Sequence, residues 1–119
     1  RIYLLRNGRL LQVTRDHSLV QELVEKGEIK PEEMRTHPGR NMITRAVGVG
    51  LTVEADLMQI PLEAGDKLLL CSDGLTNMVS NEQIEEILLQ NGGEQACALL
   101  IQKANNAGGM DNITAVVIE

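Results

Sequence analysis

The sequence predicts one α+β domain over residues 1–119, with helices packed on a largely antiparallel sheet. Three observations support this fold class: short aliphatic runs typical of strands alternate with amphipathic helical patterns, Asn7-Gly8 joins two strand-like runs, and the last strand-like run follows a helical pair. A chain of 119 residues is long enough to bury a core of its own.

The first 27 residues predict a β-hairpin followed by a short helix. Asn7-Gly8 favours a two-residue turn, because both central residues of that turn need a positive φ. Asp16-His17-Ser18 then offers capping oxygens to a helix whose apolar residues between positions 19 and 24 share one face, and Gly27 ends it. We therefore assign His17 to the start of the helix rather than to catalysis.

Residues 28–50 predict an irregular insertion. Pro31 can start a brief helix through Met34, but later prolines and glycines interrupt any periodicity. The loose alternation from Thr52 to Ile60 then predicts a strand.

The remaining residues predict a strand, two helices and a final strand. An aliphatic run closes at Asp73, a helix capped by Ser80 or Asn81 extends to Gln90, and a second helix covers residues 94–107. The last strand follows Asp111 and extends to the end of the sequence.

Composition argues against several classes of partner. The formal charge is −6, from 17 acidic and 11 basic residues, which disfavours nucleic acid and an anionic membrane surface. No apolar run approaches the roughly 20 residues that span a bilayer, so we expect a cytoplasmic protein. The two cysteines, Cys71 and Cys97, lie in no metal-binding pattern and are expected to be buried, reduced thiols.

Two aspartates lie where an aliphatic strand meets a glycine turn. Asp73 precedes Gly74 at the end of one predicted strand, and Asp111 follows Gly108-Gly109 at the start of another. If those strands are antiparallel neighbours, both carboxylates reach the same end of the sheet, where oxygen ligands suit Mg²⁺ or Mn²⁺. Asp beside Gly is also a common turn residue, and that structural interpretation stays open from the residues alone.

Four stretches together resemble the bacterial form of the metal-dependent type 2C (PPM) serine/threonine protein phosphatases, in their C-terminal portion. Two are the stretches 68–76 and 108–114 around the aspartates, which look like the last two metal-site motifs of that family. The other two, 14–20 and 37–48, are similar to the stretches that bracket its flap.

The resemblance implies a four-layer α/β/β/α sandwich of mostly antiparallel sheets flanked by helices, and hydrolysis of phosphoserine or phosphothreonine by a metal-activated water. It implies Mn²⁺ or Mg²⁺, two or more ions in the complete domain, with Asp73 and Asp111 as ligands of the same metal and Asp73 also near a third ion. Asn112 is expected to orient Asp111 by hydrogen bonding.

Residues 28–50 would then form the flap, where His37, Arg40, Asn41 and Arg45 are candidates for contacting phosphate or peptide. The motifs that supply the family's other metal ligands, general acid and phosphate-binding arginine would lie upstream of Arg1. This chain would hold no catalytic residue beyond its metal ligands and would be inactive alone, pairing with the missing upstream half or with a swapped copy. Phosphoproteins and a cognate Ser/Thr kinase are the partners that the resemblance implies.

Two other hypotheses remain open from the sequence. One is a non-catalytic regulatory domain of the same fold, in which the aspartate turns are structural. The other is a module that binds a divalent ion or a phosphopeptide without turnover.

Overall fold

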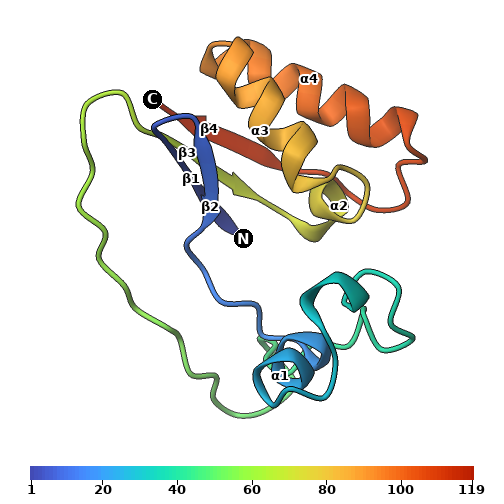
Figure 1. The fold of residues 1–119 in the computed structure, drawn as a ribbon. Helices are drawn as coiled ribbons and strands as arrows, with labels where there is room; N and C mark the ends of the chain where they lie inside the picture. Colours follow the sequence, from blue (N-terminus) through green and yellow to red (C-terminus); the bar gives the residue numbers. More distant parts are fainter. The chain divides into compact units, whose positions relative to one another are not determined.

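A computed structural model describes residues 1–119, which form two compact units (Figure 1). The first unit comprises Arg1–Thr14 together with Leu62–Glu119, and the second comprises Arg15–Pro61. The first unit contains one antiparallel sheet in the order β2-β1-β3-β4, built from β1 (Ile2–Arg6), β2 (Arg9–Gln12), β3 (Lys67–Cys71) and β4 (Ala115–Ile118). The α+β prediction is therefore confirmed.

The β1–β2 hairpin forms around the predicted turn. Asn7 and Gly8 have φ angles of 51° and 77°, which is the left-handed backbone that this two-residue connection requires. The edge strand β2 is tied to a helix, because the backbone N–H of Leu10 donates to Oε2 of Glu85 at 2.6 Å.

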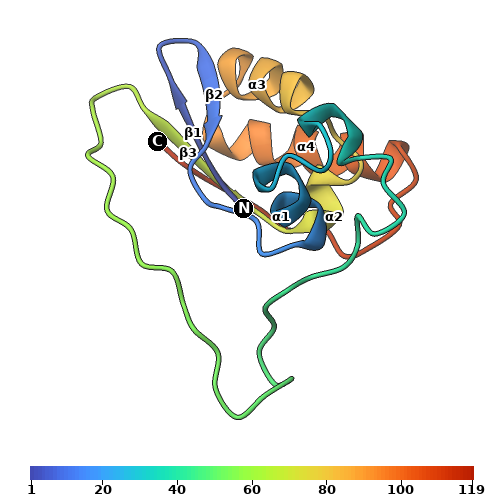
Figure 2. The same ribbon diagram turned by 60° about the horizontal axis from the view of Figure 1, so that its bottom comes forward.

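Three helices of the first unit are α2 (Asp73–Thr76), α3 (Asn81–Gln90) and α4 (Gly93–Asn106). Figure 2 shows α3 and α4 beside the sheet. Ser80 begins α3 with a reciprocal cap, in which its Oγ accepts from the N–H of Gln83 and its own N–H donates to that side chain. The predicted helices α3 and α4 are confirmed, whereas the short α2 was not predicted. None of the helices combines the length and apolar character that crossing a bilayer requires.

The core lies between one face of the sheet and these helices. Tyr3, Leu69 and Val117 occupy one row across the sheet and pack against buried helix residues such as Leu88 and Leu100. Both cysteines are free, as predicted, but each is partly exposed rather than buried.

The opposite face of the sheet is also apolar. Strand alternation places Leu4, Leu68 and Ile118 in a row on that face. Three large apolar side chains of the sheet are about half exposed or more: Val116 at 47%, Ile118 at 50% and Leu11 at 61%. An antiparallel sheet with one solvated face normally carries polar residues there, so this face has the composition of a buried surface.

The second unit is built around α1 (Leu19–Glu25) and the 3₁₀ turn η1 (Pro31–Glu33). Ser18 caps α1 by accepting from the N–H of Gln21, and Gly27, with a φ of 73°, follows its end, as predicted. Residues 42–44 pair with residues 17–19: Leu19 N–H donates to the carbonyl of Met42, and Thr44 N–H to that of His17.

The strand predicted over Thr52–Ile60 is absent, and that prediction is wrong for this chain. The segment has neither helix nor strand, and its residues are exposed throughout. A strand requires a neighbour for its backbone hydrogen bonds. No backbone N–H between Thr52 and Ile60 finds an acceptor within this chain.

The free energy of unfolding should decrease at low pH, partly because Asp66 becomes protonated. Its carboxylate accepts hydrogen bonds from Arg6 Nε at 2.9 Å and Nη2 at 2.6 Å. These bonds, and to a smaller extent the hydrogen bond from the Glu63 backbone N–H, lower the pKa of Asp66 to about 2. A lowered carboxyl pKa stabilises the fold above the unfolded value, and this contribution is lost as the pH falls through the folded value. Denaturant titrations between pH 7 and pH 2 should show a weaker acid dependence in Asp66→Asn, and equal dependence in both proteins would contradict this role.

Candidate functional site

The two aspartates singled out from the sequence lie at one end of the sheet. β3 and β4 are antiparallel neighbours in a register that pairs Cys71 with Ala115. Asp73 follows the end of β3 by two residues, and Asp111 precedes the start of β4 by four. Both residues are exposed at that end.

Ser72 joins the two aspartate loops. Its backbone N–H donates to the carbonyl of Thr114 at 3.1 Å and thereby continues the β3–β4 ladder. Its Oγ donates to the carbonyl of Asn112 at 3.2 Å and accepts from the N–H of Thr114 at 3.0 Å. One serine therefore holds the backbone directly before Asp73 against the backbone directly after Asp111.

Gly74 allows an even closer contact between these loops. A Cβ at this position would lie 2.2 Å from the backbone oxygen of Asn112 and 2.9 Å from its carbonyl carbon. Both atoms belong to the main chain, so they cannot move aside as a flexible side chain could. Glycine is thus required for the turn that begins α2 to reach the loop before β4.

Asp111 sits in a turn shaped by the two preceding glycines. Gly108 and Gly109 have φ angles of 129° and 51°, which side-chain-bearing residues rarely adopt. Oδ1 of Asp111 accepts from the backbone N–H of Asn112 at 2.7 Å. The hydrogen bond between these two residues therefore comes from the Asn112 backbone, and Asp111 as a whole is exposed.

This end of the sheet offers oxygen donors to a cation but not a complete set. Two exposed carboxylates at one edge suit a hard divalent ion, because Mg²⁺ and Mn²⁺ prefer oxygen ligands. No group of three or more His, Cys, Asp or Glu side chains in the chain could hold a metal ion. Any further His, Cys, Asp or Glu ligand of such a site would have to come from outside these 119 residues.

The predicted flap residues His37, Arg40 and Asn41 lie in the second unit, near one another in the chain. Nδ1 of His37 accepts from the N–H of Gly39 at 2.9 Å, so this ring stabilises its own turn. Arg40 and Asn41 are exposed, and Arg40 donates to the carbonyl of His37 at 3.4 Å. Their charge and amide groups are open to a ligand, whereas one ring nitrogen of His37 is already engaged.

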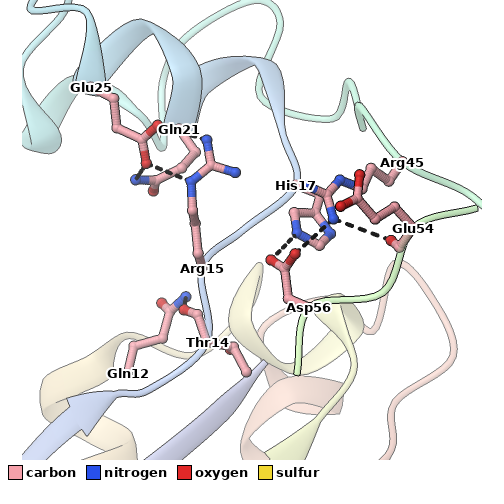
Figure 3. A network of polar contacts seen from close by, with 9 residues as sticks. All are labelled: Gln12, Thr14, Arg15, His17, Gln21, Glu25, Arg45, Glu54 and Asp56. Carbon is pink, nitrogen blue, oxygen red and sulfur yellow. Dashed lines mark hydrogen bonds and ion pairs between the residues drawn. The ribbon is translucent and has the colours of Figure 1, made fainter. Parts of the chain in front are cut away.

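Arg45, the fourth flap candidate, belongs to a different cluster of the second unit (Figure 3). Its Nη1 donates to Asp56 Oδ1 at 2.8 Å and to the backbone carbonyl of Glu54 at 3.1 Å. Asp56 also contacts His17, with 2.7 Å between Oδ2 and Nε2. The hydrogen bonds from His17 and then Arg45 lower the pKa of Asp56.

The same figure shows a second ion pair of this unit. Arg15 binds Glu25 through two hydrogen bonds of 2.7 Å and 2.6 Å, and Gln21 donates to the same carboxylate. The bond from Arg15 is the main reason why the pKa of Glu25 falls to about 2. This pair fixes the chain entering α1 to the end of that helix.

Sequence reasoning missed Ser72, Gly74 and Asp56 as positioning residues. The close contact at Gly74 could not be predicted, because the sequence shows there only an Asp-Gly dipeptide, which occurs in many kinds of turn. Asp56 lies 39 positions from His17, and nothing in the sequence links them.

Comparison with known proteins identifies the fold and its relatives. The chain is 48% identical over 118 residues to the serine/threonine phosphatase Stp of Listeria welshimeri, covering 98% of this chain and 47% of that protein. The crystal structure of the Mycobacterium tuberculosis serine/threonine phosphatase PstP superposes with a TM-score of 0.93 at 47% identity, covering 98% of this chain and 49% of that one. The chain belongs to the PPM family of serine/threonine phosphatases.

The match extends over nearly the whole chain but not over the whole of its relatives. The chain spans about half the length of the curated PPM phosphatases it matches. Another similar structure is that of the PstP catalytic domain in complex with two manganese ions. It matches with a TM-score of 0.79 at 40% identity, covering 100% of this chain and 50% of that one. No protein-family model matches the sequence.

Replacing Gly74 with alanine should destabilise the fold by about 1–3 kcal/mol, the usual cost of forcing extra atoms into a packed position. The reason is the 2.2 Å approach of the new Cβ to the Asn112 carbonyl. Denaturant unfolding measures the loss. Gly50→Ala is the control, because its Cβ would meet nothing closer than 3.6 Å, and it should change stability by less than about 0.5 kcal/mol. Equal effects of the two variants would contradict the close contact.

Proposed function

We propose that this chain is part of a metal-dependent protein phosphatase that hydrolyses phosphoserine and phosphothreonine. The observation that carries the proposal is the pair of carboxylates, Asp73 and Asp111, which the β3–β4 register and the Ser72 hydrogen bonds keep at one end of the sheet. The named relatives, which are serine/threonine phosphatases, support the same reaction class.

In this proposal Asp73 and Asp111 bind Mn²⁺ or Mg²⁺, two or more ions being present in the complete domain. The bound ions would supply a water activated for attack on phosphorus and charge that offsets the phosphate. The chain's own contribution is to hold two oxygen donors in place before the ion arrives. Asn112 acts through Asp111, because its backbone N–H fixes one carboxylate oxygen.

We assign residues 1–119 to the C-terminal part of one phosphatase domain, with residues 28–50 as the flap. Arg40 and Asn41 are the flap residues best suited to meet a phosphopeptide, since both are exposed. Arg45 and His37 are already engaged with other groups of the second unit and would shape the flap rather than reach out to phosphate.

The rest of the active site would come from an upstream half of the domain, so the 119-residue chain should be inactive by itself. The apolar face of the sheet, which bears Leu11, Val116 and Ile118, supports such pairing because it has the character of a buried surface. A swapped copy of the chain is the other occupant to be tested.

We further propose that the complete enzyme acts on phosphoproteins in the cytoplasm, against a cognate Ser/Thr kinase in signal transduction. The two free cysteines fit a reducing compartment.

The test is Mn²⁺-dependent phosphate release from a phosphothreonine peptide. The enzyme is a chimera of this chain with the part of the Listeria welshimeri phosphatase that lies upstream of the matched region. Asp73→Asn should reduce release at least about 100-fold, because even residues that merely support metal ligands cost 10- to 100-fold when replaced. Glu86→Gln, which removes an exposed carboxylate of α3, is the matched control and should retain activity.

The outcomes separate the candidate functions. Release that depends on Asp73 and is absent from the 119-residue chain alone supports the proposal. A folded chimera that neither binds Mn²⁺ nor releases phosphate supports the non-catalytic regulatory domain instead. One that binds Mn²⁺ through Asp73 and Asp111 but releases no phosphate supports the ion-binding module. Unchanged Mn²⁺ affinity after joint replacement of Asp73 and Asp111 by asparagine would remove the metal site.

A further inference from the structure

Two segments that lie far apart in the sequence meet at the base of the proposed flap. Residues 17–19 pair with residues 42–44 through two backbone hydrogen bonds, of 2.9 Å and 3.0 Å, and one antiparallel bridge. We call this pairing the flap base. It closes a loop that contains α1, η1 and the exposed flap residues Arg40 and Asn41.

Asp56 adds side-chain contacts at the flap base. Its Oδ2 lies 2.7 Å from Nε2 of His17, and its Oδ1 accepts from Nη1 of Arg45 at 2.8 Å (Figure 3). His17 belongs to one of the paired segments, and Arg45 directly follows the other. One carboxylate therefore joins both sides of the flap base. We call His17, Arg45 and Asp56 the Asp56 cluster, and all three residues lie in the second unit.

The Asp56 cluster is too exposed to be explained as a source of stability. The side chains of His17, Arg45 and Asp56 are 26%, 31% and 40% exposed. Ion pairs with this much access to water usually contribute little, because the charges are screened and long side chains lose freedom. What the cluster does is restrict geometry, since it fixes the chain at positions 54–56 to both sides of the flap base.

The exposed flap residues lie directly beside the flap base. Arg40 and Asn41 precede Met42, whose carbonyl accepts from the N–H of Leu19 at 3.0 Å. A loop whose ends are fixed has fewer conformations to lose when it contacts a ligand, so it binds an extended ligand more tightly. A small ligand that does not reach the loop gains nothing from this order. The Asp56 cluster is thus placed to affect the affinity for extended ligands selectively.

We propose that Asp56 is a positioning residue for phosphopeptide recognition. With His17 and Arg45 it keeps the flap base closed, and it thereby reduces the conformational entropy that the flap loses on binding a phosphopeptide. The inference rests on the proposed function for the identity of the substrate. It adds a residue outside the flap that acts on substrate affinity through its neighbours, without touching the substrate.

Arg45 is the competing candidate for such an effect, because a guanidinium group can bind phosphate directly. Its Nη1, however, already donates to the Asp56 carboxylate and to the carbonyl of Glu54 at 3.1 Å. A phosphate approaching this group would also meet the negative charge of Asp56. We therefore assign Arg45 to the support of the flap base.

Steady-state kinetics of the chimera with the upstream part of the Listeria welshimeri phosphatase test the role of Asp56. The two substrates are a phosphothreonine peptide and p-nitrophenyl phosphate, which has no peptide part. Asp56→Ala should raise KM for the peptide about 3- to 10-fold, as expected for the ordering of roughly one side chain. Its kcat for the peptide, and both constants for the small ester, should change less than about twofold.

Glu54→Ala is the matched control. It removes one exposed carboxylate from the same segment, and Arg45 contacts only the backbone carbonyl of Glu54, which this variant keeps. The two variants therefore alter the net charge equally, but only Asp56→Ala removes a side chain of the cluster. Glu54→Ala should leave KM for the peptide within about twofold of the parent value.

Two further measurements connect the effect to the cluster. Arg45→Ala should also raise KM for the peptide, and combining it with Asp56→Ala should give no further rise, because both remove the same contact. Amide hydrogen exchange at Leu19 and Thr44, which donate across the flap base, should be faster in Asp56→Ala than in Glu54→Ala. The amide of Gln83, in the cap of α3, is the unaffected reference.

Several results would overturn the inference. A parallel loss of activity with both substrates would place Asp56 in folding or in the chemistry. Equal effects of Asp56→Ala and Glu54→Ala would assign the effect to net charge. A further rise of KM in the double variant would make Arg45 a peptide ligand in its own right. Unchanged KM in Asp56→Ala would remove the positioning role but not the enzyme.

Failure of the proposed function has a different signature. If the chimera hydrolyses neither substrate, that function fails, and the Kd of the peptide from fluorescence anisotropy with Mn²⁺ takes the place of KM. A weaker Kd in Asp56→Ala than in Glu54→Ala would then support the positioning role, and equal values would contradict it.

Discussion

The contact between the start of α2 and the loop before β4 is the constraint on which the arrangement of the site depends. Gly74 lets two stretches of main chain approach without an intervening side chain, and Ser72 ties the same stretches with three hydrogen bonds. The contact is possible only because the β3–β4 register pairs Cys71 with Ala115. That register is in turn set by the buried row that includes Leu69, since slipping it by one residue would turn this side chain to the other face.

Backbone contacts position the two aspartates of this candidate site, and no basic side chain of the chain neutralises their charges. Asp73 and Asp111 carry like charges at one end of the sheet, and neither forms an ion pair within the chain. A divalent cation bound by both carboxylates would offset the repulsion between their like charges. Elsewhere the chain pairs its carboxylates with arginine, as at Asp66 and Glu25, where the pKa values fall to about 2. The contrast sets the two site aspartates apart from the structural ones.

The parts of the fold that could be predicted from the sequence are those specified by neighbouring residues. Asn7-Gly8 defines its hairpin, and Ser80 with Gln83 defines the start of α3, because each feature is complete within four positions. The alternation of Thr52–Ile60 is equally local, but a strand also needs a neighbour, and the chain contains none for it. The link from His17 to Asp56 could not be predicted, since nothing in the sequence indicates contact between distant side chains. The sequence predicted that Asp73 and Asp111 lie at the same end of the sheet. It did not predict that Gly74 allows their two loops to come into contact.

The proposed division of the metal site between this chain and the rest of a phosphatase domain is consistent with where the stabilising contacts lie. Every contact that positions Asp73 and Asp111 is internal to the first unit: the β3–β4 ladder, the Ser72 bonds and the Gly74 approach. The loops that carry the two proposed ligands are therefore positioned by contacts of this chain alone. The apolar face of the sheet, by contrast, stays partly exposed within this chain, as Val116 and Ile118 show. Under the proposed function, this chain would position its two ligands by itself, whereas burial of the sheet face and charge compensation would need other residues and ions. Ion binding and domain completion should then be thermodynamically coupled.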